Sequence, residues 1–577
     1  MSNLATPRIR IRIYPFSGGE FVLDGSTSQV LRCSVSKSLK DISGGKFNIV
    51  LAPGGPGGTN DPQTWDRVIT PMSLCIIDMA RDRHAQTVMV GLVTETTQTE
   101  IWNPGNNVRR TTQISGMDFM YFFVREQYYT LSAFGLVSAQ LGQVGGLAIG
   151  AAQKYSPAQA GNAWYNEVLG GKTGLLSVVQ FNLGNGKTVS LSDILAVHFQ
   201  SYITSPAFIP IYLNFLLEQG SWWGKFYDIF PFPFYELLLL NAPVGNFSHP
   251  ITGNKNRPYA NFSQSTSYVS YSNVTQSISG IGKTSDIYQA APPAFVARVN
   301  PLPYTYYNSS NSSWTWDATR WNQDLWRFSP ENLGFFETNL GYGLTEVRNL
   351  YVVESATAQG LLGLQNTLLT SAAMTFGIMM DGHSIEKYGY RPEVMNTLWF
   401  VDGKRGVVAV ANQQLPPVGS TSQLLLLFQE ILGRLASYYE PTPHMLSGTV
   451  TMPLRPDIVP GNRFEFDPFK VTTTNSSDPS GKYAFYIEGI SHDFVFGERS
   501  STTLQLSRGL LLSDYANENL MIALHRGLTD RQNGILKENS TITNGLKYFT
   551  SNEFNTQTFL GQLPPLFSNF YTTSGKS

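Results

Sequence analysis

The strongest constraint on the fold is a β pattern that occurs twice, once near each end of the chain. Within Met445–Gly509, the alternating run Phe485–Phe494 is followed by a second strand-like run, Ser501–Gly509. Alternation with a period of two residues is typical of strands that bury one face. The same order of segments occurs near the N-terminus: Pro71–Asp78 corresponds to Pro460–Asp467, Val90–Val93 to Glu488–Ser491, and Thr111–Gly116 to Thr502–Ser507. We therefore predict two copies of one β module.

Length and composition favour a multi-domain protein with extensive contact surfaces. A chain of 577 residues exceeds a single hydrophobic core, so two to four domains are expected. Charged residues make up 14% of the chain, below the roughly 25% of an ordinary soluble domain. Aromatic residues reach 13%. Aromatic side chains are enriched and Lys, Glu and Asp depleted at protein interfaces, so we favour an assembling protein over a β-rich monomer.

Charge and cysteine content exclude other classes. The formal net charge of −1 argues against a dedicated nucleic-acid binder, although Arg8, Arg10 and Arg12 alternate along one predicted strand. Cys33 and Cys75 are too few for a disulfide framework, and we predict that both are buried free thiols. The N-terminal residues show no signal peptide, so we expect synthesis in a host cytoplasm.

The first module is predicted from alternating segments. Arg8–Tyr14, Val30–Val35 and Lys46–Leu51 have the pattern of strands. The Gly-rich stretch Ala52–Asn60 lacks the GK[ST] ending of a phosphate-binding loop and is predicted to be a turn.

The middle of the chain has a mixed pattern. Leu131–Ala152 approaches the length of a membrane span, but its polar residues favour a buried or interfacial helix over membrane insertion. Asp228–Leu240 is predicted to be a buried strand, and Asn246–Trp314 to be a long ordered loop. Gln423–Glu440 has the apolar spacing of an amphipathic helix. Asp514–Ser577 is polar and is expected to be an arm that orders on a partner.

Catalytic constellations are missing from the sequence. It contains no GxSxG, HExxH or GxGxxG motif and no cysteine and histidine set with metal-binding spacing. His492 and Asp493 are neighbours on a predicted strand, so their side chains should point to opposite faces and not form a catalytic pair. The tryptophans at 314, 316, 321 and 326 could stack on sugars, but we favour a packing role. We assign no catalytic, cofactor-binding or metal-binding residue.

Several short segments resemble a known family. In the first module they are Pro71 to Val93 and Gly116–Asp118; in the middle, Pro233–Leu237, Glu346–Val352 and Ile385–Arg391; in the second module, Pro460–Gly461, Phe485–His492 and Thr502–Gly509. In this order they resemble the baseplate hub proteins of long-tailed, especially contractile, bacteriophages. Related proteins are the hub portions of type VI secretion spikes and of contractile injection systems. The run Leu131–Ala152, the loop Asn246–Trp314 and the C-terminal arm depart from smaller members.

The resemblance implies a mainly β fold with α+β accessory regions and two tube-like β-barrel modules. We expect a first module at 1–127, a helical insertion at 128–227 and a mixed α/β region at 228–440. This region includes the long loop rich in Ser, Asn and Tyr, and its strands could join the second barrel. The second module is expected at 441–512 and a C-terminal extension arm at 513–577.

The resemblance also implies a non-enzymatic structural protein of the virion, located in the tail baseplate. A homotrimer would adapt the sixfold tail tube to the threefold central spike and form part of the channel for DNA ejection. Expected partners are the tail tube protein, the central spike protein and other baseplate (wedge) proteins, with the tape measure protein as a further candidate. Genomic DNA would be in contact only in transit, and no stable membrane insertion or cofactor is expected. The alternative is a cell-wall-degrading tail enzyme that acts during host penetration.

Overall fold

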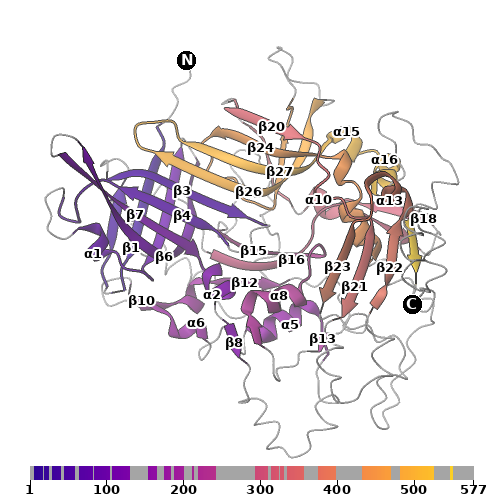
Figure 1. Ribbon diagram of the computed structural model, residues 1–577, viewed down its shortest axis with the longest axis horizontal. Helices are drawn as coiled ribbons and strands as arrows, with labels where there is room; N and C mark the ends of the chain where they lie inside the picture. The colour runs from indigo at the N-terminus through magenta and orange to yellow at the C-terminus, as the bar shows by residue number, and fades with distance from the viewer. Residues whose placement is uncertain are drawn as a thin grey trace, which may run out of the picture.

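The computed structural model describes residues 6–129, 154–241, 293–355, 375–397, 432–468, 481–525 and 546–549, with short gaps inside the first three ranges. Within these residues the chain is mainly β, with a large curled sheet and minor helices, and the predicted fold class is confirmed. The sheet has thirteen strands drawn from both ends of the chain. Figure 1 shows it extending over the smaller elements.

The N-terminal half of the sheet contains seven strands. They are β1 (Arg8–Tyr14), β2 (Phe21–Asp24), β3 (Val30–Ser38), β4 (Lys46–Leu51), β5 (Leu74–Arg81), β6 (His84–Asn103) and β7 (Asn107–Asp118). The prediction for Arg8–Tyr14 is confirmed: its three isoleucines are fully buried, and Arg10 and Arg12 both donate to the buried carboxylate of Asp78. Cys33 and Cys75 are buried free thiols, as predicted.

The C-terminal half contains six strands. They are β19 (Arg327–Phe328), β20 (Glu337–Gly341), β24 (Leu446–Pro453), β25 (Arg463–Phe466), β26 (Tyr483–Val495) and β27 (Ser501–Leu511). All pairings in the large sheet are antiparallel except the short pairing of β19 with β25. The aromatic residues Trp326, Phe464 and Phe485 lie in the core of this half.

The two halves repeat one strand order. Hydrogen-bonded neighbours run β5-β6-β7-β4-β3 in the first half and β25-β26-β27-β24-β20 in the second. Matching turns lead into β5 and β25. The backbone N–H of Met72 donates to the carbonyl of Val93 at 2.7 Å, and that of Gly461 donates to Ile487 at 2.7 Å. Met72 and Gly461 both have left-handed φ values, 68° and 76°. The predicted duplication is therefore visible in backbone geometry.

The detailed register corrects the sequence alignment. The match of Pro71–Asp78 with Pro460–Asp467 holds, because Leu74 lies opposite Leu92 as Arg463 lies opposite Tyr486. Val93, however, corresponds to Ile487 and not to Ser491. The alignment of Thr111–Gly116 with Thr502–Ser507 is likewise wrong by one residue, because Gly116 lies opposite Val93 and the residue opposite Ile487 is Leu506. A slip by four residues keeps every side chain on its face, so alternation alone cannot detect it.

A second layer lies beneath the middle of the sheet (Figure 1). It contains a small sheet of β12 (Ala196–Phe199), β16 (Pro293–Val299) and β15 (Tyr235–Asn241), with α2 (Met120–Arg125), α5 (Pro157–Trp164) and α8 (Trp222–Ile229). Its core is aromatic, with Phe226 contacting Phe123, Phe199 and Phe295. The predicted strand at Asp228–Leu240 is correct only from Tyr235, because α8 continues to Ile229.

Short elements surround this layer. They are α1 (Trp65–Val68), β8 (Gln127–Tyr129), β9 (Lys154–Tyr155), α6 (Leu175–Val178), β10 (Gln180–Asn182), β11 (Thr188–Ser190), α7 (Leu191–Ile194), β13 (Ile211–Tyr212) and β14 (Gln219–Ser221). The described part of the predicted helical insertion therefore alternates short helices with short strand pairs. Leu131–Ala152 lies outside the described residues. No helix in the described ranges is long and apolar enough to span a membrane.

A peripheral sheet lies at the end opposite the first half (Figure 1). Its strands are β23 (Pro392–Thr397), β21 (Leu350–Ser355), β22 (Thr375–Asp381) and β28 (Leu546–Phe549), and α13 (Gly382–Tyr388) follows β22. Residues 432–439 of the predicted amphipathic helix Gln423–Glu440 are helical, with Leu432 and Leu435 fully buried. A 3-10 turn, η3 (Thr442–His444), leads from there to β24.

Two segment predictions need correction. Part of the expected loop Asn246–Trp314 forms β16 and β17 (Tyr304–Asn308), and β17 pairs with β18 (Ser313–Asp317), which precedes α10 (Thr319–Gln323). Residues 246–292 and 309–312 of that loop lie outside the described part. The described parts of the expected arm fold back on their own chain, and residues 526–545 and 550–577 lie outside the described part. After α15 (Leu512–Tyr515), α16 (Glu518–His525) buries Met521 against Met445, and β28 pairs with β22.

Candidate assembly interface

The two halves join where β3 pairs with β26. We call this pairing the junction; its register runs from Gly489 opposite Ser38 to Val495 opposite Arg32. The N–H of Leu39 extends it by donating to the carbonyl of Glu488 at 2.8 Å. On the exposed face Arg32 forms a bidentate ion pair with Asp493, which contributes at most about 1 kcal/mol because such surface pairs are well solvated. The sheet is thus continuous across the two modules.

The other face of the junction buries polar side chains. Lys37 is 9% exposed and donates to the amide oxygen of Asn241, at the end of β15. Burial lowers the pKa of Lys37 to about 8, partly offset by the nearby carboxylate of Asp118. That carboxylate accepts from the N–H groups of Gly45 and Met120 at 2.7 and 3.0 Å. The second layer is therefore attached to the junction by specific hydrogen bonds as well as by apolar packing.

A buried ion pair fastens the second layer to the second half. Arg298 on β16 donates to Glu236 on β15 at 2.8 Å, to the Gly461 carbonyl at 2.6 Å and to the Tyr486 hydroxyl at 2.9 Å. Tyr486 donates to the other oxygen of Glu236. Arg298 and Glu236 are each 5% exposed in their side chains. A Cβ at Gly461 would lie 2.7 Å from the Arg298 guanidinium, so this close approach requires glycine.

His492 is a structural residue of the junction. It is 3% exposed, and its Nδ1 lies 2.9 Å from Thr502 Oγ1, which also accepts from the N–H of Arg455. Burial lowers the pKa of His492 to about 4, with Lys37 acting in the same direction and Asp457 against it. Its neighbour Asp493 points to the opposite face, where it pairs with Arg32. The prediction that His492 and Asp493 diverge is confirmed.

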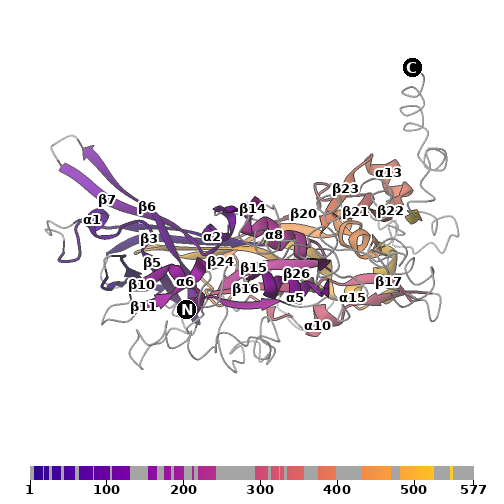
Figure 2. The same cartoon turned by 90° about the horizontal axis from the view of Figure 1, so that it is seen from below.

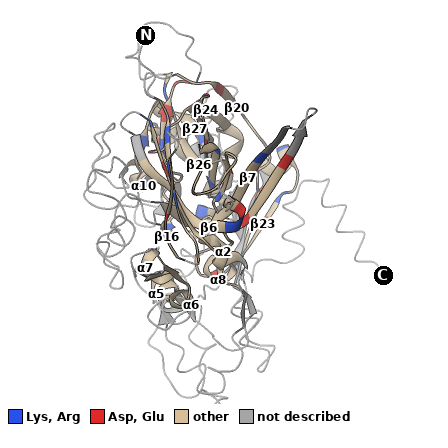
Figure 3. Ribbon diagram, turned by 90° about the vertical axis from the view of Figure 1, so that its left-hand side faces the viewer, with Lys and Arg blue, Asp and Glu red and all other residues tan. Residues whose placement is uncertain are grey.

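Several edges of the large sheet lack a strand partner among the described residues, the outer edge of β2 included, and two of them bear on assembly. Beyond Val93, β6 is paired only with β7 along the remainder of its length. The two strands extend past the body of the molecule, as Figure 2 shows. In Figure 3 their outer parts carry residues of both charge signs, which include the ion pair of Glu100 with Arg110. The second edge is β20, which is paired only with β24 and is largely exposed.

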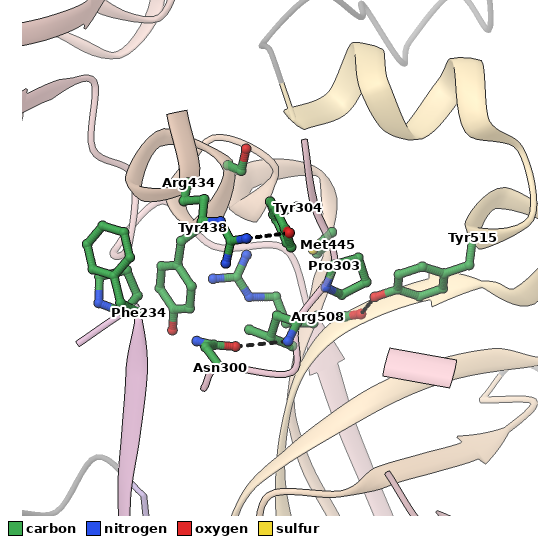
Figure 4. Close-up of a pocket in the computed structure, with 12 residues that line it drawn as sticks. Phe234, Asn300, Pro303, Tyr304, Arg434, Tyr438, Met445, Arg508 and Tyr515 are labelled. Atoms are coloured by element: carbon green, nitrogen blue, oxygen red, sulfur yellow. Dashed lines mark hydrogen bonds between the residues drawn. The ribbon is translucent and has the colours of Figure 1, made fainter. Parts of the chain in front are cut away.

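A pocket that could hold a ligand lies between helix 432–439, β27 and the start of β17 (Figure 4). Its two arginines are stacked on tyrosines: Arg434 lies 3.5 Å from the ring centre of Tyr304, and Arg508 lies 4.1 Å from that of Tyr438. The hydroxyl of Tyr515 donates to the Arg508 carbonyl at 2.7 Å. No carboxylate lines this pocket. It therefore lacks the two acids of a glycosidase, and its contacts join helix 432–439 to β27.

Two of the four clustered tryptophans lie in the core and cannot serve as a binding platform. Trp321 and Trp326 are each 1% exposed and lie in different core clusters, beside Tyr486 and Phe464 respectively. The packing interpretation is confirmed for these two residues. Among the described residues no group of three or more His, Cys, Asp or Glu side chains is placed to hold a metal ion.

Sequence reasoning missed the polar residues that join the second layer to the large sheet. Glu236 lies inside the apolar run Tyr235–Asn241, and Lys37 lies in a strand with buried alternate positions. A charged residue in such a run signals a buried partner, because an unpaired charge is costly to bury. The partners Arg298 and Asn241 are distant in sequence and only the fold identifies them.

Comparison with known proteins gives matches in structure only. No protein-family model and no curated protein sequence matches the chain. Among solved structures it is similar to a tail protein from Neisseria meningitidis, with 10% identity, TM-score 0.40, and 87% of this chain and 96% of that one covered. It is also similar to the prophage MuSo2 43 kDa tail protein from Shewanella oneidensis, with 8% identity, TM-score 0.36, and coverage of 87% and 97%.

A third similar structure is an Escherichia coli type VI secretion component, described as similar to the T4 bacteriophage tail proteins gp27 and gp5. Identity is 7%, the TM-score 0.32, and coverage 83% of this chain and 73% of that one. The kinds of protein found are those that the sequence resemblance named. The functional proposal rests on the strand pairing of this chain itself.

Removal of Arg298 should destabilise the protein strongly. Arg298→Met leaves Glu236 buried without its counter-charge, which we expect to lower the free energy of unfolding by about 3–5 kcal/mol. Arg298→Met combined with Glu236→Gln removes both charges and keeps an acceptor for Tyr486, so it should cost clearly less. Chemical denaturation of the three proteins measures this. Equal losses for the single and double variants would contradict a buried charge pair.

Acid should weaken the fold through His492. The pKa of His492 is lowered, so the unfolded chain binds the proton more readily and stability falls as pH drops from about 6.5 to about 4. By about pH 5 this loss amounts to about 2 kcal/mol. His492→Asn retains a partner for Thr502 and should reduce the loss between about pH 7 and about pH 5, as measured by denaturation. His444→Asn, at a partly exposed position, is the control and should leave the loss unchanged.

Proposed function

We propose that this chain is a structural component of a phage tail, a trimeric baseplate hub that adapts the sixfold tail tube to the threefold central spike. It would form part of the channel for DNA ejection. One observation carries the proposal: two halves with the same strand order form one continuous curled sheet through the junction. Three such chains present six near-equivalent modules, which would match a sixfold tube while retaining threefold symmetry.

The junction and its buried contacts support a permanent assembly role. A continuous sheet leaves no hinge between the modules, and the Arg298 network attaches the second layer to the second half. Open strand edges are an aggregation risk that a closed ring removes. The proposed partners are the tail tube, spike and wedge proteins, with the tape measure protein as a further candidate. DNA would pass through without stable binding.

The enzyme alternative has lost part of its support. It depended on the tryptophan cluster and the polar loop before it, and Trp321 and Trp326 are buried in the core. No observation on the described residues favours a hydrolase over the hub.

Native mass of the full chain tests the assembly. We expect about three times 63.9 kDa, either alone or after addition of the spike protein. Immunogold labelling of purified virions locates the chain independently, and we expect the label at the tail tip. A chain that is monomeric with both partners, or a label confined to the capsid, would contradict the hub.

A further inference from the structure

The internal repeat shows what should cover the open edge of β6. In the second half, β26 pairs first with β25, then with the turn at Gly461, and beyond the bulge with β3. In the first half, β6 pairs first with β5 and then with the turn at Met72. Beyond the equivalent bulge, from Glu95 onward, the edge of β6 that faces away from β7 has no strand partner among the described residues. Beyond its bulge, β26 is covered by β3, whereas the matching edge of β6 has no such strand.

The repeat also identifies the strand that should occupy this edge. In the first half, β3 is the strand next to β4, with Ser34 opposite Asn48. In the second half, β20 is the strand next to β24, with Asn339 opposite Thr449. Hence β20 is the counterpart of β3. Within one chain β3 has β26 on its other side, whereas the other side of β20 is open.

We propose that β20 of one copy of this chain pairs antiparallel with the open edge of β6 in the next copy, in the register of the junction. This inference rests on the proposed trimer and deepens it. Transfer of the junction register, in which Ser491 faces Ser36 and Asp493 faces Ser34, places Thr97 opposite Gly341 and Thr99 opposite Asn339.

Exposed residues beside β20 support the assignment. Tyr342 and Leu344 are 61% and 48% exposed, although both are large and hydrophobic. Their counterparts in the first half are Lys37, which is buried, and Leu39, which packs on buried residues of the second layer. Tyr342 and Leu344 are therefore exposed apolar side chains at positions whose counterparts, Lys37 and Leu39, contact the second layer.

The contact is head-to-tail, because the surface on one copy differs from the surface on its neighbour. Such a contact closes into a ring when the rotation between copies permits it, and otherwise forms a filament. The junction within each chain and the proposed pairing between chains would then be near-equivalent and alternate around a ring. Three chains would give six such pairings.

Disulfide cross-linking of the full chain tests the register. Asp493 and Ser34 form a non-hydrogen-bonded pair, because the N–H of Leu39 donates to Glu488 and hydrogen-bonded pairs alternate from there. Thr99 and Asn339 inherit this geometry, in which side chains lie closest and a disulfide can form. Thr99→Cys with Asn339→Cys should therefore give covalent dimers and trimers on non-reducing gels after mild oxidation.

The control pair is Gln98→Cys with Asn339→Cys. Gln98 is one residue away and points to the opposite face, so it should give little or no cross-link. Each single variant should also remain uncross-linked, because native Cys33 and Cys75 are buried.

A second measurement removes the apolar contact. Tyr342→Asp should weaken self-association by about tenfold or more, because tyrosines are enriched among the few interface residues that carry most of the binding energy. Phe496→Asp changes an exposed aromatic just after β26, which lies three strands from β20 and four from β6 in the sheet, and should have no effect. Both positions are exposed in the single chain, so the fold should persist, as circular dichroism can verify.

The outcomes separate the pairing from the hub. A trimer without the Thr99–Asn339 cross-link, or with equal cross-linking in the control, overturns the pairing and leaves the hub in place. A chain that neither associates nor cross-links overturns the pairing as well, whereas immunogold labelling decides the hub separately. A selective cross-link together with loss of association in Tyr342→Asp supports the pairing.

Discussion

The backbone hydrogen bonds between β3 and β26 are the interaction on which the rest of the structure depends. They join segments as far apart as Arg32 and Asp493, which are 461 positions apart in the chain. Without them the molecule would have two separate sheets, and the edges of β3 and β26 that now pair would have unsatisfied N–H and C=O groups. With them, the second layer has a continuous surface to cover, and Lys37 can reach Asn241. Such distant pairing forms only after the chain between is closed, so we expect it to be a late event in folding.

The buried charges have a different role from the apolar core. A buried ion pair adds little net stability, but loss of one partner is costly. Arg298 contacts Glu236, Gly461 and Tyr486 at once, so a displaced second layer would leave a guanidinium and a carboxylate without partners. The aromatic core around Phe226 tolerates small displacements far better, since apolar contacts are not directional. We infer that the polar network selects one arrangement of the layers.

Much of the local structure follows from local sequence. The alternation in Arg8–Tyr14 defines a strand and its buried face, and the adjacency of His492 and Asp493 separates their side chains. The duplication was detectable because the turn before β5 repeats before β25. Its register was not. The four-residue slip at Val93 preserves the pattern of buried and exposed positions, and the one-residue error arose because Thr111-Thr112 was matched to Thr502-Thr503, which stand one position apart in the two strands. The expected loop before Trp314 was partly wrong, because β16 is stabilised by pairing with two distant strands.

The sequence by itself determined that several segments are strands with a repeating pattern of apolar positions, the absence of recognisable catalytic motifs and the presence of two related modules. These properties depend on side-chain period and residue type, which are local. Only the tertiary structure decided that β3 joins β26, that Glu236 meets Arg298, and that β6 and β20 are left with open edges. Every strand edge presents the same N–H and C=O groups, so sequence does not say which edges pair. That choice is made by the packing of the whole chain.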